Sequence, residues 1–192
     1  VLSGGAADTV LTGGLVGNIL LAAKGEAIGQ GSLDFIYKSN YGEFIEKAKT
    51  IYARYADKIV LPADLGYVGN GVRRECRIGA VPTEICAVDI GSETARQYES
   101  IILAAKTVFV NGPMGIFEQS ETELGTKTVF EALGNTAGYT VVGGGDSVTA
   151  AAKYQVKDKL GYVCTGGGAL IRFLTGEELP VVKALRHAAA AL

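Results

Sequence analysis

The stretch VVGGGDS, Val141 to Ser147, is followed about twenty residues later by TGGGA, Thr165 to Ala169. Each has an apolar, β-type run, then three glycines, then residues that can begin a helix. Glycine has no Cβ, so its backbone N–H groups can approach a phosphate closely, and a following helix adds unpaired donors and a positive dipole end. Asp146 adds an oxygen ligand of the kind that Mg²⁺ prefers. The two turns therefore predict a site for nucleotide phosphates.

The composition limits the class of protein. With 192 residues, of which 48% are hydrophobic and 20% charged, and a net charge of −2, the chain is long enough for one large or two small globular domains. It has no basic run for nucleic acid and no apolar stretch long enough to span a membrane, so we expect neither partner. Its cysteines, Cys76, Cys86 and Cys164, form no C-x-x-C pair. Neither a disulfide framework nor a zinc site is predicted, and a reducing cytoplasm is the expected setting.

Short, β-branched apolar runs alternate with helical patterns along the chain. This order is typical of an α/β fold in which a mostly parallel sheet lies between helices on both faces. Tyr67 to Val81 is polar and interrupted by glycine, and is expected to be a small antiparallel excursion or a loop. The runs expected to be strands are Thr9 to Thr12, Lys58 to Pro62, Glu84 to Asp89, Thr107 to Val110, Tyr139 to Val142 and Tyr162 to Thr165.

Helices are expected in the intervals between these runs. Apolar residues recur every three or four positions from Ser39 to Tyr55, and again from about Thr122 to Leu133, as on one face of a helix. Another helix is expected from Ser92, a residue type that favours the N-cap position. The last two helices should follow the two glycine turns.

The start of the chain holds two similar stretches, VLSGG at Val1 to Gly5 and VLTGG at Val10 to Gly14. Parallel neighbouring strands need a crossover of at least about 10–12 residues, but only Ala6 to Thr9 separate these two. Either Val1 to Gly5 is not a parallel strand, or a helix between Gly5 and Ala6 is absent from the sequence.

Two phosphate-binding fingerprints are absent, the G-x-G-x-x-G of dinucleotide sites and the Gly-Lys of a P-loop. A dehydrogenase and a P-loop ATPase therefore lose support. A structural alternative remains, in which GGGDS is only a tight strand-to-helix turn with Asp146 as the N-cap. Repetition of the turn at the carboxyl ends of neighbouring strands favours ligand binding, because open α/β sheets bind ligands there.

A third motif, NGPMGIFE at Asn111 to Glu118, directly follows the predicted strand Thr107 to Val110. Gly112 and Pro113 force a turn. The motif offers an amide, an apolar wall and, at Glu118, a carboxylate that can accept hydrogen bonds from ribose hydroxyls. The alternative is an ordinary packed loop.

Three polar residues carry weaker signals. Asp64 and Asp89 lie at the ends of apolar runs and either face the cleft or cap turns, and capping is the commoner role. His187, the one histidine, is expected at the surface.

Taken in order, these motifs resemble those of phosphoglycerate kinase, specifically of its C-terminal, nucleotide-binding half. The resemblance implies a single three-layer α/β sandwich over residues 1–192, with a central, mostly parallel, Rossmann-like sheet. It also implies reversible phosphoryl transfer between 1,3-bisphosphoglycerate and ADP in glycolysis, with Mg²⁺ and ADP or ATP bound by this half. The matching segments are VLSGG, TGGLVGNILLAAKG, DIGSET, AKTVFVNGPMGIFE, GTKTVFEAL, TVVGGGDS, YVCTGGGA and FLTGEELPVVKAL.

The resemblance implies a role for each matching site position. Asp146 would also hold Mg²⁺, and Glu118 would bind the ribose. The positions on the nucleotide phosphates would be Gly144, Gly145, Asp146 and Ser147. The positions along the nucleotide groove would be Asn111, Pro113 and Met114. The glycines packed against adenine would be Gly4, Gly5, Gly13 and Gly14, and those facing the transferred phosphoryl group would be Gly166, Gly167 and Gly168.

The sequence departs from the family pattern in three places. The N-terminal half, with its basic patch for 3-phosphoglycerate or 1,3-bisphosphoglycerate and its essential arginine, is not in the sequence. No lysine follows the first glycine turn, where Ala6 and Ala7 stand, and Ala188 to Leu192 offer little to return the chain to the other half. We therefore expect the isolated domain to bind nucleotide but hardly to turn over. The alternatives are a stand-alone nucleotide-binding or regulatory module and a dehydrogenase-like domain.

Overall fold

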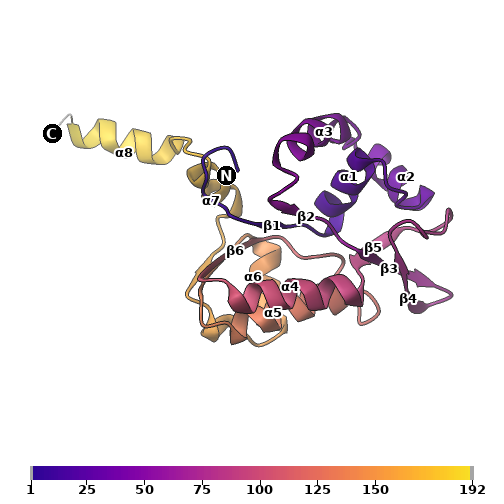
Figure 1. Cartoon of the computed structure of the whole chain (residues 1–192). Coiled ribbons are helices and arrows are strands. Elements are labelled where there is room, and N and C mark those ends of the chain that lie inside the picture. The colour runs from indigo at the N-terminus through magenta and orange to yellow at the C-terminus, as the bar shows by residue number, and fades with distance from the viewer. Residues whose placement is uncertain (1, 191–192) are drawn as a thin grey trace.

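The β-branched runs pair mainly as parallel strands in the computed structural model, which describes residues 2–190 (Figure 1). Strands β6 (Thr107–Asn111), β7 (Tyr139–Gly143) and β8 (Tyr162–Cys164) form a parallel sheet in that order. Strands β1 (Val10–Leu11) and β2 (Ile59–Val60) form a second, two-stranded parallel sheet. The α/β class with parallel strands and flanking helices is thus confirmed, and its parallel strands are divided between two sheets.

A hairpin interrupts the parallel arrangement, as one of the two alternatives for Tyr67 to Val81 predicted. Strands β3 (Asp64–Gly69) and β4 (Val72–Arg77) pair antiparallel, and β3 also pairs antiparallel with β5 (Ala87–Ile90). The hairpin turns at Asn70 and Gly71, which both have positive φ. Asn-Gly is the pair that such a two-residue turn favours.

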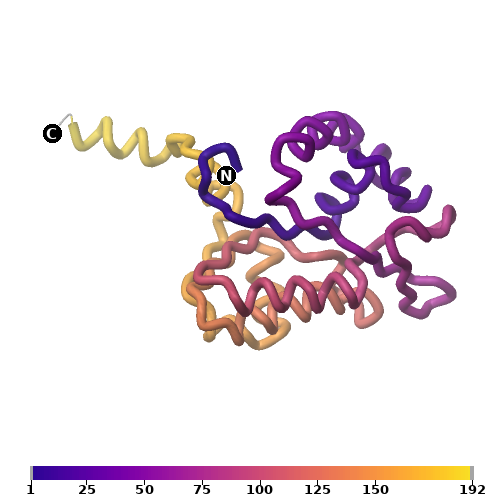
Figure 2. Tube along the Cα trace, in the orientation of Figure 1, coloured from indigo at the N-terminus to yellow at the C-terminus, as the bar shows by residue number. Residues whose placement is uncertain are grey.

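The helices form two groups, each around its own buried cluster. Figure 1 places α1 to α3 together on one side of the molecule and α4 to α6 on the other, and Figure 2 shows α8 extending away from both groups. No helix of residues 2–190 is both long and apolar enough to cross a membrane. The helices are α1 (Gly14–Lys24), α2 (Gln30–Lys38), α3 (Glu43–Tyr55), α4 (Ser92–Ala104), α5 (Leu124–Asn135), α6 (Gly145–Lys153), α7 (Gly167–Leu174) and α8 (Pro180–Ala190), with a 3₁₀ turn, η1 (Lys157–Lys159).

One tyrosine joins the two groups. Tyr98 on α4 is fully buried, and its hydroxyl, a single donor, lies 2.8 Å from the Thr12 carbonyl oxygen and 3.0 Å from that of Val60. These carbonyls lie at the ends of β1 and β2. A buried hydroxyl needs such partners, because an unpaired one costs about 1–3 kcal/mol. Tyr98 therefore fixes the small parallel sheet against α4.

Two helix starts differ from the sequence prediction. The helix expected from Ser39 begins at Glu43, because Asn40 adopts a left-handed conformation with φ of 61° that a right-handed helix cannot contain. The helix expected to be capped by Ser92 has Gly91 at its N-cap, with no side-chain cap from that residue.

Asp64 supplies the missing cap from β3. Its carboxylate accepts hydrogen bonds from the backbone N–H groups of Glu93, at 2.9 Å, and Thr94, at 2.8 Å. The Thr94 hydroxyl lies 2.5 Å from the same carboxylate. The capping interpretation of Asp64 is therefore confirmed. Both of its carboxylate oxygens bind the start of α4, so Asp64 has a structural role and does not face the cleft.

The first residues of the described chain form a turn. The Gly5 N–H donates to the Leu2 carbonyl at 3.2 Å, and residues 2–5 lie in no strand. Val1, the first residue of the VLSGG stretch, lies outside the described residues. Residues 2–5 are therefore not part of a parallel strand, as the first of the two alternatives predicts, and the absence of a helix between Gly5 and Ala6 stays a prediction.

Candidate functional site

The loop from Asn111 to Glu118 touches glycine turns on three other segments. The first is Gly13–Gly14, where the Gly14 N–H donates to the Met114 carbonyl at 2.7 Å. Gly14 has a φ of 54°, in the left-handed region, and a Cβ on Gly13 would lie 3.1 Å from the Met114 carbonyl oxygen and 3.2 Å from its Cα. The backbone approach between these segments therefore depends on the absence of side chains.

The second contact is with the GGGDS turn. The Asn111 side-chain amide donates to the Gly143 carbonyl at 2.9 Å, and the Gly112 N–H donates to the Ser147 hydroxyl at 2.7 Å. Ser147 is fully buried. Its hydroxyl is therefore occupied within the protein and is not available to a bound anion.

The N-terminus of α6 lies at this turn. Gly144 is the N-cap, with a φ of 99°, and Asp146 stands in the first turn with its side chain exposed. The interpretation of Asp146 as the N-cap is therefore wrong. The first N–H groups of a helix have no partner within it, so the exposed residues Gly145 and Asp146 present backbone donors at the positive end of the helix dipole.

The third contact is with the TGGGA turn. The Gly144 N–H donates to the Cys164 carbonyl at 2.9 Å, which joins the two turns directly. A Cβ on Gly167 would lie 2.7 Å from the Gly144 Cα and 2.9 Å from the Asn111 amide nitrogen, whereas one on Gly168 would meet open space. Gly166 is the N-cap of α7. The structure thus brings together all three sequence motifs.

Glu118 ends the loop with an exposed side chain. One carboxylate oxygen, Oε2, accepts a hydrogen bond from the Phe117 N–H at 3.0 Å. Phe117 is buried in the cluster formed by α4, α5 and α6. The carboxylate is therefore held at the rim of the site by a residue that is itself fixed in the core.

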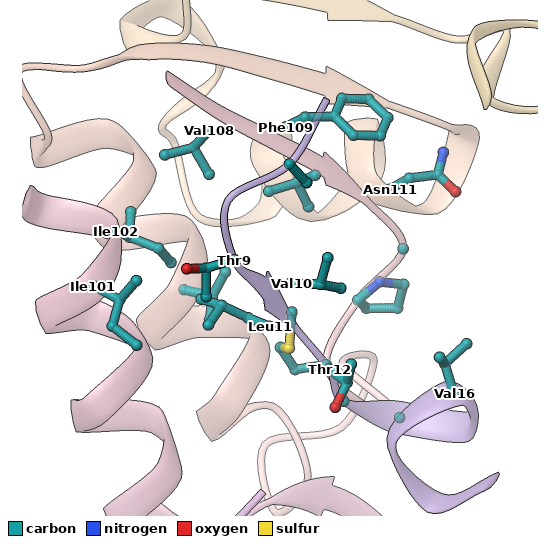
Figure 3. Close-up of a pocket in the computed structure, with 18 of the residues that line it drawn as sticks. Thr9, Val10, Leu11, Thr12, Val16, Ile101, Ile102, Val108, Phe109 and Asn111 are labelled. Atoms are coloured by element: carbon teal, nitrogen blue, oxygen red, sulfur yellow. The ribbon is translucent and has the colours of Figure 1, made fainter. Parts of the chain in front are cut away.

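An apolar cavity of about 1840 Å³ adjoins these motifs and has Pro113, Met114, Glu118 and Asp146 among its lining residues. Figure 3 shows Val10 and Leu11 of β1, Val108 and Phe109 of β6, and Ile101 and Ile102 of α4 around it. Among the described strands, β1 and β6 each have one hydrogen-bonded neighbour, so each turns a free edge away from its sheet. An apolar wall with a few polar groups at its rim is the usual form of a small-molecule site.

The structure separates one expected pair of glycines from this group. Gly4 and Gly5 lie in the N-terminal turn, whose neighbouring residues Leu2 and Ser3 line the cavity. A Cβ on Gly5 would meet nothing within 4 Å. This turn therefore borders the cavity but does not share the tight glycine packing of the other motifs.

The Asn111–Glu118 loop also packs against β5, a contact that no sequence pattern predicted. The Ile116 N–H donates to the Val88 carbonyl at 2.8 Å, and a Cβ on Gly115 would collide with the same carbonyl. Asp89, the next residue, is buried, and its Oδ2 accepts hydrogen bonds from Arg73 and from the Gly125 N–H, each at 2.9 Å. The other oxygen, Oδ1, is buried without a partner.

This environment changes the acidity of Asp89. Burial raises its pKa from an ordinary value of 3.8 to about 6, although the Gly125 N–H and the Arg73 guanidinium act in the opposite direction. Asp89 joins β5 to the start of α5 and to the hairpin strand that carries Arg73. The carboxylate therefore has a structural role, because it caps the start of α5, in line with the capping interpretation.

A metal ion at this site would depend on few protein ligands. Within residues 2–190 there is no group of three or more His, Cys, Asp or Glu side chains that could hold a metal ion. Asp146 offers a single exposed carboxylate beside the backbone donors of α6. That donor set fits Mg²⁺, which usually retains several waters and binds through one or two carboxylates together with substrate phosphates.

The sequence profile of the family described as Phosphoglycerate kinase matches residues 3–177. This chain belongs to the phosphoglycerate kinase family. The phosphoglycerate kinase of Methanothermus fervidus is 39% identical over 188 residues, which make up 98% of this chain and 46% of that protein. The phosphoglycerate kinase of Methanothermobacter thermautotrophicus is 40% identical over 187 residues, or 97% of this chain and 45% of that protein.

Solved structures of the family have the same fold. The crystal structure of phosphoglycerate kinase from Pyrococcus horikoshii OT3 matches all of this chain with a TM-score of 0.91 and 35% identity. The structure of phosphoglycerate kinase from Coxiella burnetii matches 96% of it with a TM-score of 0.84 and 29% identity. In each case the match covers 48% of the other chain. This chain therefore spans about half the length of its phosphoglycerate kinase relatives.

The contact between the two glycine turns predicts unequal effects of two neighbouring substitutions. Gly167→Ala should lower the free energy of unfolding by about 1–3 kcal/mol, because the added methyl group would push against the Gly144 backbone. Gly168→Ala, in open space on the same helix, should leave it unchanged or raise it by up to about 1 kcal/mol. Urea denaturation followed by circular dichroism measures both, and equal effects of the two variants would contradict the described packing.

The raised pKa of Asp89 predicts a pH-dependent stability. The folded chain binds this proton more tightly than the unfolded chain, so the contribution is fully present below pH 3.8 and is lost as the pH rises through about 6. Compared with Asp89→Asn, the unmodified chain should lose up to about 2–3 kcal/mol of unfolding free energy between pH 4 and pH 7. Urea denaturation at several pH values tests this. If the stability of the unmodified chain relative to Asp89→Asn stays constant, or rises, between pH 4 and pH 7, burial does not dominate at Asp89.

Proposed function

We propose that this chain is the nucleotide-binding domain of a glycolytic phosphoglycerate kinase and binds Mg-ADP or Mg-ATP at the site described above. The observation that carries the proposal is the convergence of the two glycine turns and the Asn111–Glu118 loop at the N-terminus of α6. Membership of the phosphoglycerate kinase family supports it. An anion at such a helix N-terminus is stabilised by backbone donors and by the dipole.

The geometry supports a role for each part of the site. The unpaired, exposed backbone donors of Gly145 and Asp146 would bind the nucleotide phosphates, with Gly144 and Ser147 shaping the turn around them, and Glu118 would accept hydrogen bonds from the ribose. Asp146 would hold Mg²⁺, which when bound would neutralise phosphate charge. The wall from Asn111 to Met114, with the glycines at Gly13–Gly14, would accept the base.

The TGGGA turn would face the transferred group. Gly166, Gly167 and Gly168 lie at the N-terminus of α7, directly beside the GGGDS turn. In the proposed reaction a phosphoryl group passes between 1,3-bisphosphoglycerate and ADP, reversibly. Family catalysis of this kind depends on positioning and on charge stabilisation more than on covalent chemistry by the protein.

The phosphoglycerate would be bound by a second domain, since this chain spans about half the length of its relatives. We therefore propose that the 192-residue chain binds nucleotide but turns over poorly by itself. A domain that binds nucleotide without ever catalysing is the alternative, and an assay with the complementary half of a relative distinguishes the two. The free thiols at Cys76, Cys86 and Cys164 are consistent with a cytoplasmic setting.

Substitution of Asp146 tests the proposed function. In calorimetric titrations the unmodified chain should bind Mg-ADP saturably and more tightly than metal-free ADP. Asp146→Ala should remove the benefit of Mg²⁺. It should lower the free energy of unfolding by no more than about 1 kcal/mol, because the exposed carboxylate caps nothing and only its attraction to the helix dipole is lost.

Asp158→Ala is the matched control, since Asp158 is an exposed carboxylate on η1, away from the glycine turns. It should bind Mg-ADP like the unmodified chain. No binding of Mg-ADP at millimolar concentration by the unmodified chain would refute the proposed function, and an Asp146→Ala variant that keeps full Mg²⁺ dependence would refute the metal assignment.

A further inference from the structure

Lys153 stands at the opposite end of α6 from the glycine turn. The helix begins at Gly145 beside the proposed phosphate site and ends at Lys153, so its two ends lie near two different parts of the same site. The Lys153 side chain turns from the helix end toward the last residues of the Asn111–Glu118 loop. It did not stand out in the sequence, because its acceptors are backbone carbonyls that no sequence pattern identifies.

Three acceptors surround the Lys153 ammonium group. It donates to the Phe117 carbonyl at 2.5 Å and pairs with Oε2 of Glu123 at 2.7 Å. The Glu118 carbonyl lies 3.5 Å away. An ammonium group has three donors, so this set satisfies it without a further partner. Lys153 is therefore held toward the loop, with 35% of its side chain still exposed to solvent.

Glu123 keeps the ammonium group in place. Its carboxylate also accepts a hydrogen bond from the Tyr154 hydroxyl at 3.3 Å. The hydrogen bond from Lys153 lowers the pKa of Glu123, against the opposing effect of burial, so the carboxylate stays charged at neutral pH. Because Glu123 immediately precedes α5, the contact joins the start of α5 to the end of α6.

The hydrogen bonds of Lys153 fix the backbone conformation at Phe117 and Glu118. Lys153 binds the carbonyls of Phe117 and Glu118, while the Phe117 N–H binds the Glu118 carboxylate. Phe117 is 4% exposed, so the chain is fixed on its other side by the core. Rotation of the Phe117–Glu118 peptide would break the Lys153 hydrogen bonds and move the Glu118 side chain.

We propose that Lys153 is a positioning residue for Glu118. It holds the Glu118 carboxylate at a fixed place relative to the proposed phosphate site at the other end of α6. The inference rests on the proposed function, because it assumes that Glu118 receives ribose hydroxyls. Lys153 itself touches no nucleotide in this arrangement. Substitution of Lys153 should therefore weaken the binding of a nucleotide that has ribose hydroxyls, and should not change the affinity for one that has none.

The test compares Mg-ADP with Mg-2′,3′-dideoxy-ADP in calorimetric titrations of the 192-residue chain. The unmodified chain should bind Mg-ADP about tenfold more tightly, as expected for hydrogen bonds to a charged acceptor at a partly exposed site. Lys153→Met should reduce this ratio to nearly one and leave the affinity for the dideoxy nucleotide unchanged. Lys153→Arg, which keeps the charge and the donors, should restore most of the ratio.

Two further variants separate positioning from a general loss of stability. Glu123→Gln removes the charged partner of Lys153 without touching the loop, and should lower the ratio even if Lys153→Met proves too unstable to titrate. Lys157→Met changes an exposed lysine on η1 and should leave the ratio at its original value. In a Glu118→Ala background, Lys153→Met should have no further effect on the ratio.

The outcomes distinguish the two proposals. If the unmodified chain binds neither nucleotide, the proposed function fails and the role of Lys153 fails with it. If it binds both nucleotides, and Lys153→Met and Glu123→Gln retain the full tenfold ratio, the proposed function stands and the positioning role is refuted. An equal loss of affinity for both nucleotides would also refute it, because that pattern indicates a purely structural role.

Discussion

The close approach of backbone to backbone at glycine is the constraint on which this site depends. Gly144 lies against Gly167 at a separation that leaves no room for a Cβ on Gly167, and a Cβ on Gly13 would lie only 3.1 Å from the Met114 carbonyl oxygen. Hydrogen bonds from Asn111 and Gly112 then connect the loop to the strand and helix on either side of the GGGDS turn. The glycines thus serve the packing of the site, whichever ligand it accepts.

The fold supplies this constraint from several directions. β6 and β7 place Asn111 and Gly143 side by side in register, so that the Asn111–Glu118 loop and the GGGDS turn leave the sheet at the same edge. Asp89 and the Val88 carbonyl support the loop from β5, and Lys153 holds its far end. α6 therefore has its positive end at the GGGDS turn and its last residue on the loop beside it.

Much of this arrangement could be predicted from the sequence, where the signal is local. β-branched runs predicted the strands, and the three motifs predicted which segments would meet, because carboxyl ends of parallel strands share one edge of a sheet. The class and the family followed from these motifs, and the family comparisons confirm both.

The features that escaped prediction depend on contacts between distant segments. Asp64 caps a helix that begins almost thirty residues later, so Ser92 looked like a better N-cap than it is. Asn40 ends one helical pattern by its left-handed conformation, which a pattern of apolar residues does not show. Ser147 has its hydroxyl turned inward, and Lys153 binds carbonyls, and neither fact leaves a trace in residue type or spacing.

Hydrogen–deuterium exchange with and without Mg-ADP tests the central claim, that the glycine turns and the loop form a single nucleotide site. Bound nucleotide should slow exchange together at Gly13–Gly14, at Asn111–Glu118 and at Gly144–Ser147, with little change in the hairpin Asp64–Arg77. Slower exchange at one of these segments alone, or protection in the hairpin and not in the turns, would contradict the account.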